Sequence, residues 1–388
     1  MRAAKSFLLL ILALTGVCNA QTPHGAAASP SRNAKATATV SASYYGAVDV
    51  GSKGTKGALY SFVSEDEGPN AVVIFSKTIN TKLVSSMKDG RFTPEGIADA
   101  VIATKKILAA MKAEAQKRNI TVDAYYVVGS SGAAKAVNKA VLVKVMKNST
   151  GIDMDFVDAA REGYYGLLSA VPLSRRPVSM YVDVGSGNTK LGCLVGDSDL
   201  GNFKNLEIPF GSASTVNEAF KRSPLDVNAG IASVMADVND SYQKQSRDIP
   251  CLRNRPRVYW TGGAAWAIAT FMHPEKALDG WVLISKRDLD TFLARLKDGT
   301  WNAKEFVFSF PKDMSLDRQK AIRAQAEEDR RGKNGVENVF VREQILSGVS
   351  IMQTVLNSSN PSVIVRFARS GNFIYGYALD KFKADNPG

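Results

Sequence analysis

Two short segments far apart in the chain have nearly the same sequence. Asp49-Val-Gly-Ser-Lys-Gly-Thr-Lys56 and Asp183-Val-Gly-Ser-Gly-Asn-Thr-Lys190 are identical at six of eight positions and begin 134 residues apart. Solenoid repeats recur roughly every 20 to 50 residues, so this spacing does not fit a solenoid. Each segment stands between two apolar runs, in the order strand, glycine-rich turn, strand. We therefore expect one domain fold to occur twice.

The apolar runs around these segments predict alternating strands and helices. In the first half we expect strands at 44–50, 57–63, 71–76 and 124–129, a helix that begins after Thr93 at Pro94, a helix through Met146 and another from Ala159. In the second half we expect strands at 180–184 and 191–195. Strands that alternate with helices indicate an α/β fold with a largely covered sheet.

The first twenty residues have the layout of a secretory signal. Arg2 and Lys5 precede the apolar run 7–14, and small residues end at Ala20, where we expect cleavage. This run is shorter than the roughly 20 residues that cross a bilayer, so no membrane span is expected in the mature chain. Residues 21–43, mostly Ala, Ser and Thr, are expected to form a flexible leader. The sequence thus predicts an exported protein, periplasmic or secreted.

Charge and cysteine content narrow the classes of ligand. The chain has 388 residues, with 49 Lys and Arg against 37 Asp and Glu, and this net charge of +12 favours anionic partners. Two histidines and three cysteines exclude a zinc cluster and a disulfide scaffold, so a metal would be a hard cation on carboxylates. The apolar run 191–195 favours a buried thiol at Cys193, while oxidation with Cys251 stays open for an exported chain.

The repeated segment is suited to binding phosphate and metal. Its glycines allow a sharp turn that directs backbone N–H groups towards an anion, and its hydroxyls and lysines add donors and charge. Asp49 and Asp183 suit a hydrated Mg²⁺, with Ca²⁺ and Mn²⁺ as alternatives. The predicted phosphate-binding residues are Gly51, Ser52, Lys53, Gly54, Thr55 and Lys56 in the first loop and Gly185, Ser186, Gly187, Asn188, Thr189 and Lys190 in the second. Lys53, at the loop tip, is equally compatible with an exposed side chain.

Two further segments complete the pattern of a known superfamily. Ser130-Ser131-Gly132, with Asn138, precedes a helix, and Glu162 of Ala160-Arg-Glu-Gly163 lies 21 residues before Asp183. With these motifs in this order, residues 44–382 resemble the actin, sugar kinase and heat-shock chaperone superfamily. Within it the chain looks most like the Ppx/GppA family of exopolyphosphatases and guanosine pentaphosphate phosphohydrolases, with the apyrases close behind. The arginine usual after the serine segment of that family is absent around Ala134.

This resemblance implies a fold and a set of site residues. The fold would be two actin-like (ribonuclease H-like) α/β domains, 44–160 and 161–382, that face each other across a cleft. Ser130 and Ser131 would contact phosphate, and Asp49 and Asp183 would take part in catalysis and hold the metal. Glu162 would be the base that activates water, although by itself a glutamate in a first helical turn is typical of a surface position.

The resemblance also implies an activity. It would be an exported phosphoric anhydride hydrolase, most like an exopolyphosphatase that releases terminal phosphate from inorganic polyphosphate by Mg²⁺-assisted attack of water. A nucleoside tri- or diphosphate hydrolase of apyrase type, a guanosine pentaphosphate hydrolase, a nucleotide-dependent kinase and a non-hydrolysing binding module remain alternatives. We expect a polyphosphate or nucleotide partner and no nucleic acid duplex, and a homodimer stays open.

Two arginines and one charged segment are less specific on sequence grounds. Arg161 and Arg366 are compatible with surface charges and with phosphate clamps. The charged segment 327–331 is interpreted as a solvated helix end.

Overall fold

The computed structural model describes residues 42–386 apart from 53, 64–69, 85, 360, 361, 370 and 371. The predicted signal peptide and nearly all of the predicted leader therefore lie outside the described residues, as does Lys53. Within the described part of the chain, no helix combines the length and the hydropathy needed to cross a bilayer.

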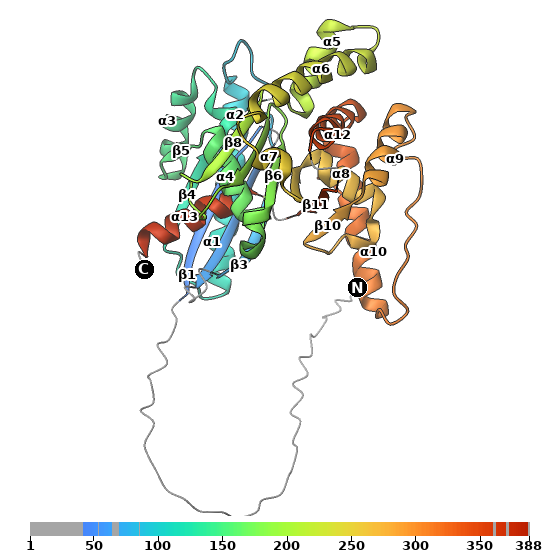
Figure 1. Ribbon diagram of the computed structural model, residues 1–388. Helices are drawn as coiled ribbons and strands as arrows, with labels where there is room; N and C mark the ends of the chain where they lie inside the picture. The colour runs from blue at the N-terminus through green and yellow to red at the C-terminus, as the bar shows by residue number, and fades with distance from the viewer. Residues whose placement is uncertain are drawn as a thin grey trace, which may run out of the picture. The chain divides into compact units, whose positions relative to one another are not determined.

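Two mixed sheets, drawn in blue to green and in green to red in Figure 1, organise the described chain. The first has the order β3-β2-β1-β4-β5 and the second the order β10-β11-β9-β6-β7-β8. The strands of the first are β1 (Ser43–Val50), β2 (Gly54–Val63), β3 (Asn70–Asn80), β4 (Ala124–Gly129) and β5 (Met154–Phe156). Those of the second are β6 (Ser179–Val184), β7 (Thr189–Leu194), β8 (Phe203–Ile208), β9 (Arg257–Gly262), β10 (Trp281–Ile284) and β11 (Ile364–Ala368).

The two sheets share one topology. In each, three antiparallel strands in sequence order are followed by two strands parallel to the first of them: β1, β2, β3 with β4 and β5, and β6, β7, β8 with β9 and β11. The second sheet adds β10 as an antiparallel edge strand. The duplicated α/β fold predicted from the repeated segment is confirmed.

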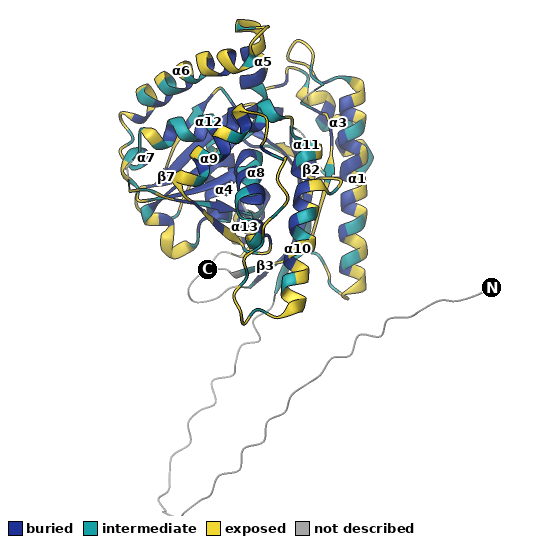
Figure 2. Ribbon diagram, turned by 90° about the vertical axis from the view of Figure 1, so that its right-hand side faces the viewer, coloured by how far each residue is buried: buried dark blue, intermediate teal, exposed yellow. Residues whose placement is uncertain are grey.

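Helices connect and cover these strands. They are α1 (Pro94–Lys117), α2 (Ser131–Ala134), α3 (Lys139–Thr150), α4 (Ala159–Ala170), α5 (Ser212–Arg222), α6 (Val227–Ser246), α7 (Cys251–Asn254), α8 (Gly263–Met272), α9 (Lys286–Lys297), α10 (Leu316–Arg331), α11 (Val336–Val339), α12 (Arg342–Asn357) and α13 (Phe373–Asp385), with short 3₁₀ helices η1 (Leu173–Val178) and η2 (Pro274–Lys276). Figure 2 shows buried stripes on one side of helices such as α1 and exposed ones on the other, as expected for helices packed on a core.

Helix starts follow their capping residues, and one expected helix is broken. Thr93 caps α1 by accepting a hydrogen bond from the N–H of Gly96 at 3.1 Å, as predicted. The helix expected through Met146 is instead two helices, α2 and α3, separated by residues 135–138. The break has a tertiary cause: the side chain of Asn138 pairs with the backbone N–H and C=O of Phe92 at 2.8 and 3.0 Å.

The last helix, α13, packs on the first sheet although it follows the second in sequence. It contacts β1, β2 and α4. Its Phe382 ring stacks on Phe62 of β2 at a centroid distance of 5.1 Å, and Tyr45 of β1 donates a hydrogen bond to Asp385 at 2.9 Å. One aromatic core is therefore built from residues at both ends of the described chain.

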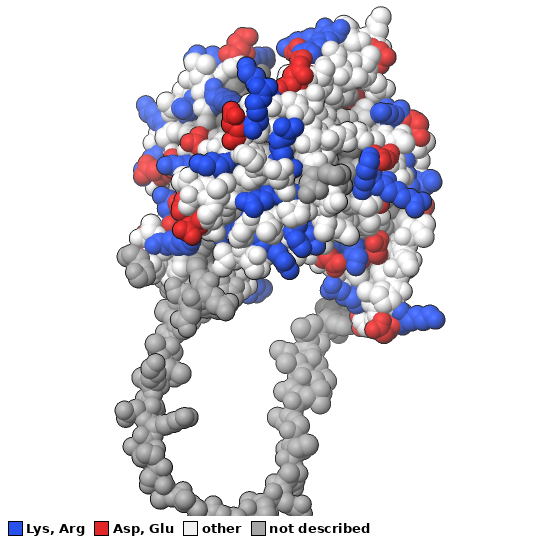
Figure 3. All heavy atoms as spheres, in the orientation of Figure 1, with Lys and Arg blue, Asp and Glu red and all other residues white. Residues whose placement is uncertain are grey.

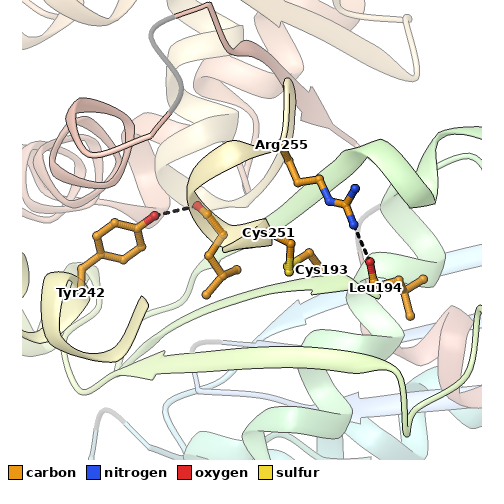
Figure 4. The surroundings of a disulfide bond; sticks show 6 residues. Cys193, Leu194, Tyr242, Cys251 and Arg255 are labelled. Carbon is orange, nitrogen blue, oxygen red and sulfur yellow. Dashed lines mark hydrogen bonds between the residues drawn. A yellow bond between two sulfur atoms is a disulfide. The ribbon is translucent and has the colours of Figure 1, made fainter. Parts of the chain in front are cut away.

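The thiol interpretation of Cys193 is wrong. Cys193 of β7 forms a disulfide with Cys251 at the start of α7, 58 residues further along (Figure 4). Beside it, Arg255, which follows the last residue of α7, donates to the backbone oxygen of Leu194 at 2.8 Å and so connects the other end of this short helix to the same strand. The apolar run correctly placed Cys193 in the core, but the partner thiol comes from a helix that the local pattern does not reveal.

The solvated helix end expected at 327–331 is also wrong in part. Arg330 is 1 % exposed and donates to the backbone oxygen of Asn302 at 2.6 Å and to Glu337 at 2.7 Å. Asp329, likewise buried, accepts a hydrogen bond from Arg369 at 2.6 Å. The charged composition of 327–331 is also typical of a solvated helix end, but here Asp329 and Arg330 have partners from other segments.

Candidate active site

The two repeated segments form the same hairpin. Asp49 lies opposite Lys56 across β1 and β2, and Asp183 lies opposite Lys190 across β6 and β7. The turns also match, because Gly51 N–H donates to Gly54 O and Gly185 N–H donates to Asn188 O, both at 3.0 Å. A Cβ on Gly51 would lie 2.9 Å from the Gly54 oxygen, so the tight turn requires glycine there.

Asp49 lies one residue before the end of β1, in a buried position. It is 7 % exposed, and its Oδ1 has no hydrogen-bond partner. Burial raises the pKa of Asp49 to about 7, with the nearby charges of Lys56 and Lys190 opposing the shift and those of Glu162 and Asp183 adding to it. A carboxylate kept away from water in this way is poised to receive a cation or a proton.

Glu162 projects from the first turn of α4, which Asp158 caps by accepting from the N–H of Arg161 at 2.7 Å. Its Oε2 accepts from the N–H of Ser131 at 2.7 Å and its Oε1 from Nζ of Lys190 at 2.6 Å. Glu162 is 7 % exposed, so the surface interpretation of this glutamate is wrong. A carboxylate has about four lone-pair positions, so this orientation still leaves both oxygens able to accept from water.

Lys190 links the two acidic groups. Its Nζ lies 2.6 Å from Glu162 and 2.8 Å from Asp183, and the residue is 4 % exposed. Burial by itself would lower the pKa of Lys190, but the carboxylates of Asp183 and Glu162 outweigh burial and raise it above its ordinary value. Lys190 is thus a permanent cation inside the site.

The second loop is held by its neighbours. The start of α5 donates to it, from Ser212 N–H to Gly185 O and from Ala213 N–H to Ser186 O, both at 2.9 Å. Asn188 donates to Ser131 Oγ at 3.4 Å and to Glu207 of β8 at 2.7 Å. The second loop therefore lies against the start of α2, which follows a strand of the first sheet.

The structure brings most of the predicted site residues together. Asp49, Glu162, Asp183 and Lys190 interact electrostatically, and Ser131 and Asn188 border them. The hydroxyl oxygens of Thr55 and Ser130 are buried without a hydrogen-bond partner. The loop residues that keep some exposure are Ser52, Lys56, Gly185, Ser186 and Gly187, whereas Gly51, Gly54, Thr55, Asn188 and Thr189 are buried.

Two predicted contacts have other partners. Thr189 donates its hydroxyl to the backbone oxygen of Phe210 at 2.8 Å, and Lys190 is held by carboxylates. Sequence reasoning missed Glu207, which holds Asn188 and also Lys135. It also did not link Thr261 to Asp183, although the hydroxyl of Thr261 lies 3.3 Å from that carboxylate. Strand pairing, which places Thr261 beside Asp183 and Glu207 beside Lys190, was the signal that could have found both.

No protein-family model matches the sequence, and no curated protein sequence matches it. Solved structures do match. A Ppx/GppA family member from Aquifex aeolicus is similar over 90 % of this chain and 100 % of its own, with 14 % identity and a TM-score of 0.62. An exopolyphosphatase from Cytophaga hutchinsonii covers 87 % of this chain and 98 % of its own, at 15 % identity and TM-score 0.58. An exopolyphosphatase-like protein covers 88 % and 98 %, at 17 % identity and TM-score 0.62.

These matches define the class of fold. The chain has the actin-like ATPase fold in the form found in Ppx/GppA structures, over nearly the full length of those proteins. The structural resemblance inferred from the two loops is confirmed.

Proposed function

We propose that the protein is an exported phosphoric anhydride hydrolase that releases terminal phosphate from inorganic polyphosphate. One observation carries the proposal. Two glycine turns with the same closing hydrogen bond, each after a strand that carries an aspartate, lie near a buried glutamate that Ser131 and Lys190 orient. The similarity in fold to exopolyphosphatases supports the same activity. Nucleoside di- or triphosphate hydrolysis, as in apyrases, is the second candidate.

In the proposed mechanism the backbone N–H groups of three loop positions that keep some exposure, Ser52, Ser186 and Gly187, bind the terminal phosphoryl oxygens. Glu162 accepts a proton from water while the water oxygen forms a bond to the terminal phosphorus. The bond from that phosphorus to the bridging oxygen breaks, and the shortened chain leaves with its electron pair. Lys190 holds Glu162 in place and offsets the negative charge of the site.

The donor set fits a divalent cation at one of the two aspartates. Asp49 has a buried oxygen without a hydrogen-bond partner, as a ligand to a hydrated metal would. Asp183 is occupied by Lys190 at 2.8 Å and Thr261 at 3.3 Å. We propose that Asp49 is the main protein ligand of Mg²⁺ and that Asp183 contributes through its charge. When bound, Mg²⁺ would neutralise phosphoryl oxygens.

Export is part of the proposal. The disulfide between Cys193 and Cys251 supports it, because disulfides persist in oxidising compartments. The layout of residues 1–20 supports it independently.

The experiment is a substrate panel. Phosphate release by the mature chain is measured with Mg²⁺ from polyphosphate, ATP, ADP and a simple phosphate monoester, each with and without a chelator. The proposal expects the highest kcat/KM on polyphosphate and little release from the monoester. A higher kcat/KM on ATP or ADP would favour the apyrase-type alternative. If no anhydride released phosphate, the hydrolase proposal would be wrong and a non-hydrolysing binding module would be favoured.

A further inference from the structure

A pocket away from the candidate active site is lined by three arginines. It lies where η1 meets β9, β10 and β11 and has a cavity volume of about 230 Å³. Arg175, Arg257 and Arg366 line it together with Tyr259 and Trp281. The strands β10 and β11 are adjacent in the second sheet (Figure 1), so the pocket wall is built on regular, hydrogen-bonded elements.

These three guanidinium groups have no carboxylate partner within the described part of the chain. None of the ion pairs there includes them, and Nη1 of Arg366 is buried without a hydrogen-bond partner. By contrast, Arg369, just beyond β11, pairs with Asp329, and Arg330 pairs with Glu337. Because unpaired cations that face one cavity repel each other, a bound anion would relieve this repulsion.

The pocket sets the size and kind of that anion. Its volume is below the roughly 300 Å³ at which pockets for drug-sized molecules begin. Guanidinium groups bind phosphate oxygens through paired N–H donors, and three of them call for several anionic oxygens in one ligand. Trp281 donates Nε1–H to the backbone oxygen of Ala170 at 3.1 Å, which fixes its half-exposed ring as a flat wall. We propose that this pocket binds a short inorganic phosphate chain of two or three phosphates.

Strand register separates this pocket from the active site. Asp183 pairs with Thr261, Tyr259 pairs with Arg366, and both pairs lie on one face of the sheet because the steps between them are two residues. Arg366 lies two strands away from Asp183 across the sheet and is displaced by two residues along the strand direction. Standard sheet spacings then place their Cα atoms roughly 12 Å apart. One phosphate group does not reach both positions. The pocket is a second anion site, and its existence does not depend on the proposed hydrolase activity.

The test uses inorganic tripolyphosphate as the probe and tryptophan fluorescence as the readout. The full mature chain carries Glu162→Gln, so that the probe stays intact. Trp281, 47 % exposed, is the most exposed of the four indoles, because Trp266 is partly buried and Trp260 and Trp301 are at 0 % and 8 %. Binding should therefore change the emission of Trp281, and Trp281→Phe should remove most of that change. Arg366→Gln and Arg257→Gln are each expected to weaken binding about tenfold, since each removes a charge-assisted contact.

The matched control is Arg318→Gln, which removes one positive charge from an exposed position on α10. It should change the affinity by less than about twofold, because a distant exposed charge is screened. Equal losses in Arg318→Gln and the pocket variants would overturn the proposal in favour of general charge attraction. So would an affinity unchanged in both pocket variants, or ATP bound more tightly than tripolyphosphate, which would assign the pocket to nucleotides.

Discussion

The ammonium group of Lys190 balances two carboxylates, those of the buried Glu162 and the partly buried Asp183. Its counterpart in the first loop, Lys56, is exposed although it occupies the same register position. The two lysines are thus identical in the repeated sequence and different in environment, because α4 brings Glu162 against the second hairpin. This contrast provides a matched pair of variants.

Lys190→Met should lower the free energy of unfolding by about 3 to 5 kcal/mol, because it leaves the buried Glu162 and the partly buried Asp183 without their cation. Lys56→Met should change it by about 0.5 kcal/mol or less, as is usual at exposed positions. Urea unfolding of both variants measures the difference. Equal changes in the free energy of unfolding in the two variants would mean that the contacts of Lys190 with Glu162 and Asp183 do not stabilise the fold.

Glu162→Gln should reduce turnover of polyphosphate about 10²- to 10⁴-fold with substrate affinity retained, because the amide cannot accept the proton from water. Glu95→Gln is the control, since Glu95 also lies in a first helical turn, that of α1, and is exposed. Steady-state kinetics separates kcat from KM. Full turnover in Glu162→Gln would remove this residue from the mechanism.

Asp49 gives the stability a pH dependence. Burial raises its pKa from 3.8 to about 7, so the folded state binds a proton that the unfolded state releases between these values. Stability should therefore fall as pH rises from about 4 to 7 and then level off, by up to roughly 4 kcal/mol from this group. In Asp49→Asn this part of the slope should vanish. The free energy of unfolding of both proteins, measured without metal at several pH values, tests this. An unchanged dependence on pH in Asp49→Asn would contradict the raised pKa of Asp49.

At the scale of elements, the sequence predicts local features well. The strand, turn, strand order of both repeats, the Thr93 cap and the start of α4 depend on residues close in sequence, and all were found. The break at 135–138 was missed because it depends on Asn138 meeting Phe92, a contact between residues far apart in sequence. For the same reason the sequence could nominate Glu162 but not its contacts with Ser131 and Lys190.

The disulfide should contribute measurably to stability at this scale. It closes a segment of 58 residues between β7 and α7, for which chain entropy suggests about 4 kcal/mol as an upper value. The double variant Cys193→Ala with Cys251→Ala should unfold at lower denaturant concentration, by about 2 to 4 kcal/mol. Thiol titration of the unfolded wild-type chain should find neither cysteine free. Two reactive thiols there would contradict the disulfide.

For the whole molecule, net charge distinguishes the two candidate substrates. Lys and Arg side chains outnumber Asp and Glu over much of the face drawn in Figure 3, in line with the net charge of +12. A long polyanion can meet more of these cations than a single nucleotide can. The apparent affinity for polyphosphate should exceed that for ATP and fall more steeply with salt, since exposed charges are screened within roughly 8 Å at physiological ionic strength. Measurement of both affinities at two salt concentrations tests this, and tighter, salt-insensitive ATP binding would contradict it.

The position of α13 decides how the chain could be divided. A fragment that ends just before α4 would contain the whole first sheet but would lack Phe382, so the rings of Tyr45 and Phe62 would face water. Such a fragment should be poorly soluble by itself, because its aromatic face has lost its cover. Joined in solution with the remaining fragment, it should recover both its packing and its solubility. The chain could therefore be divided before α4 into two fragments that fold together only by complementation, as in a split reporter.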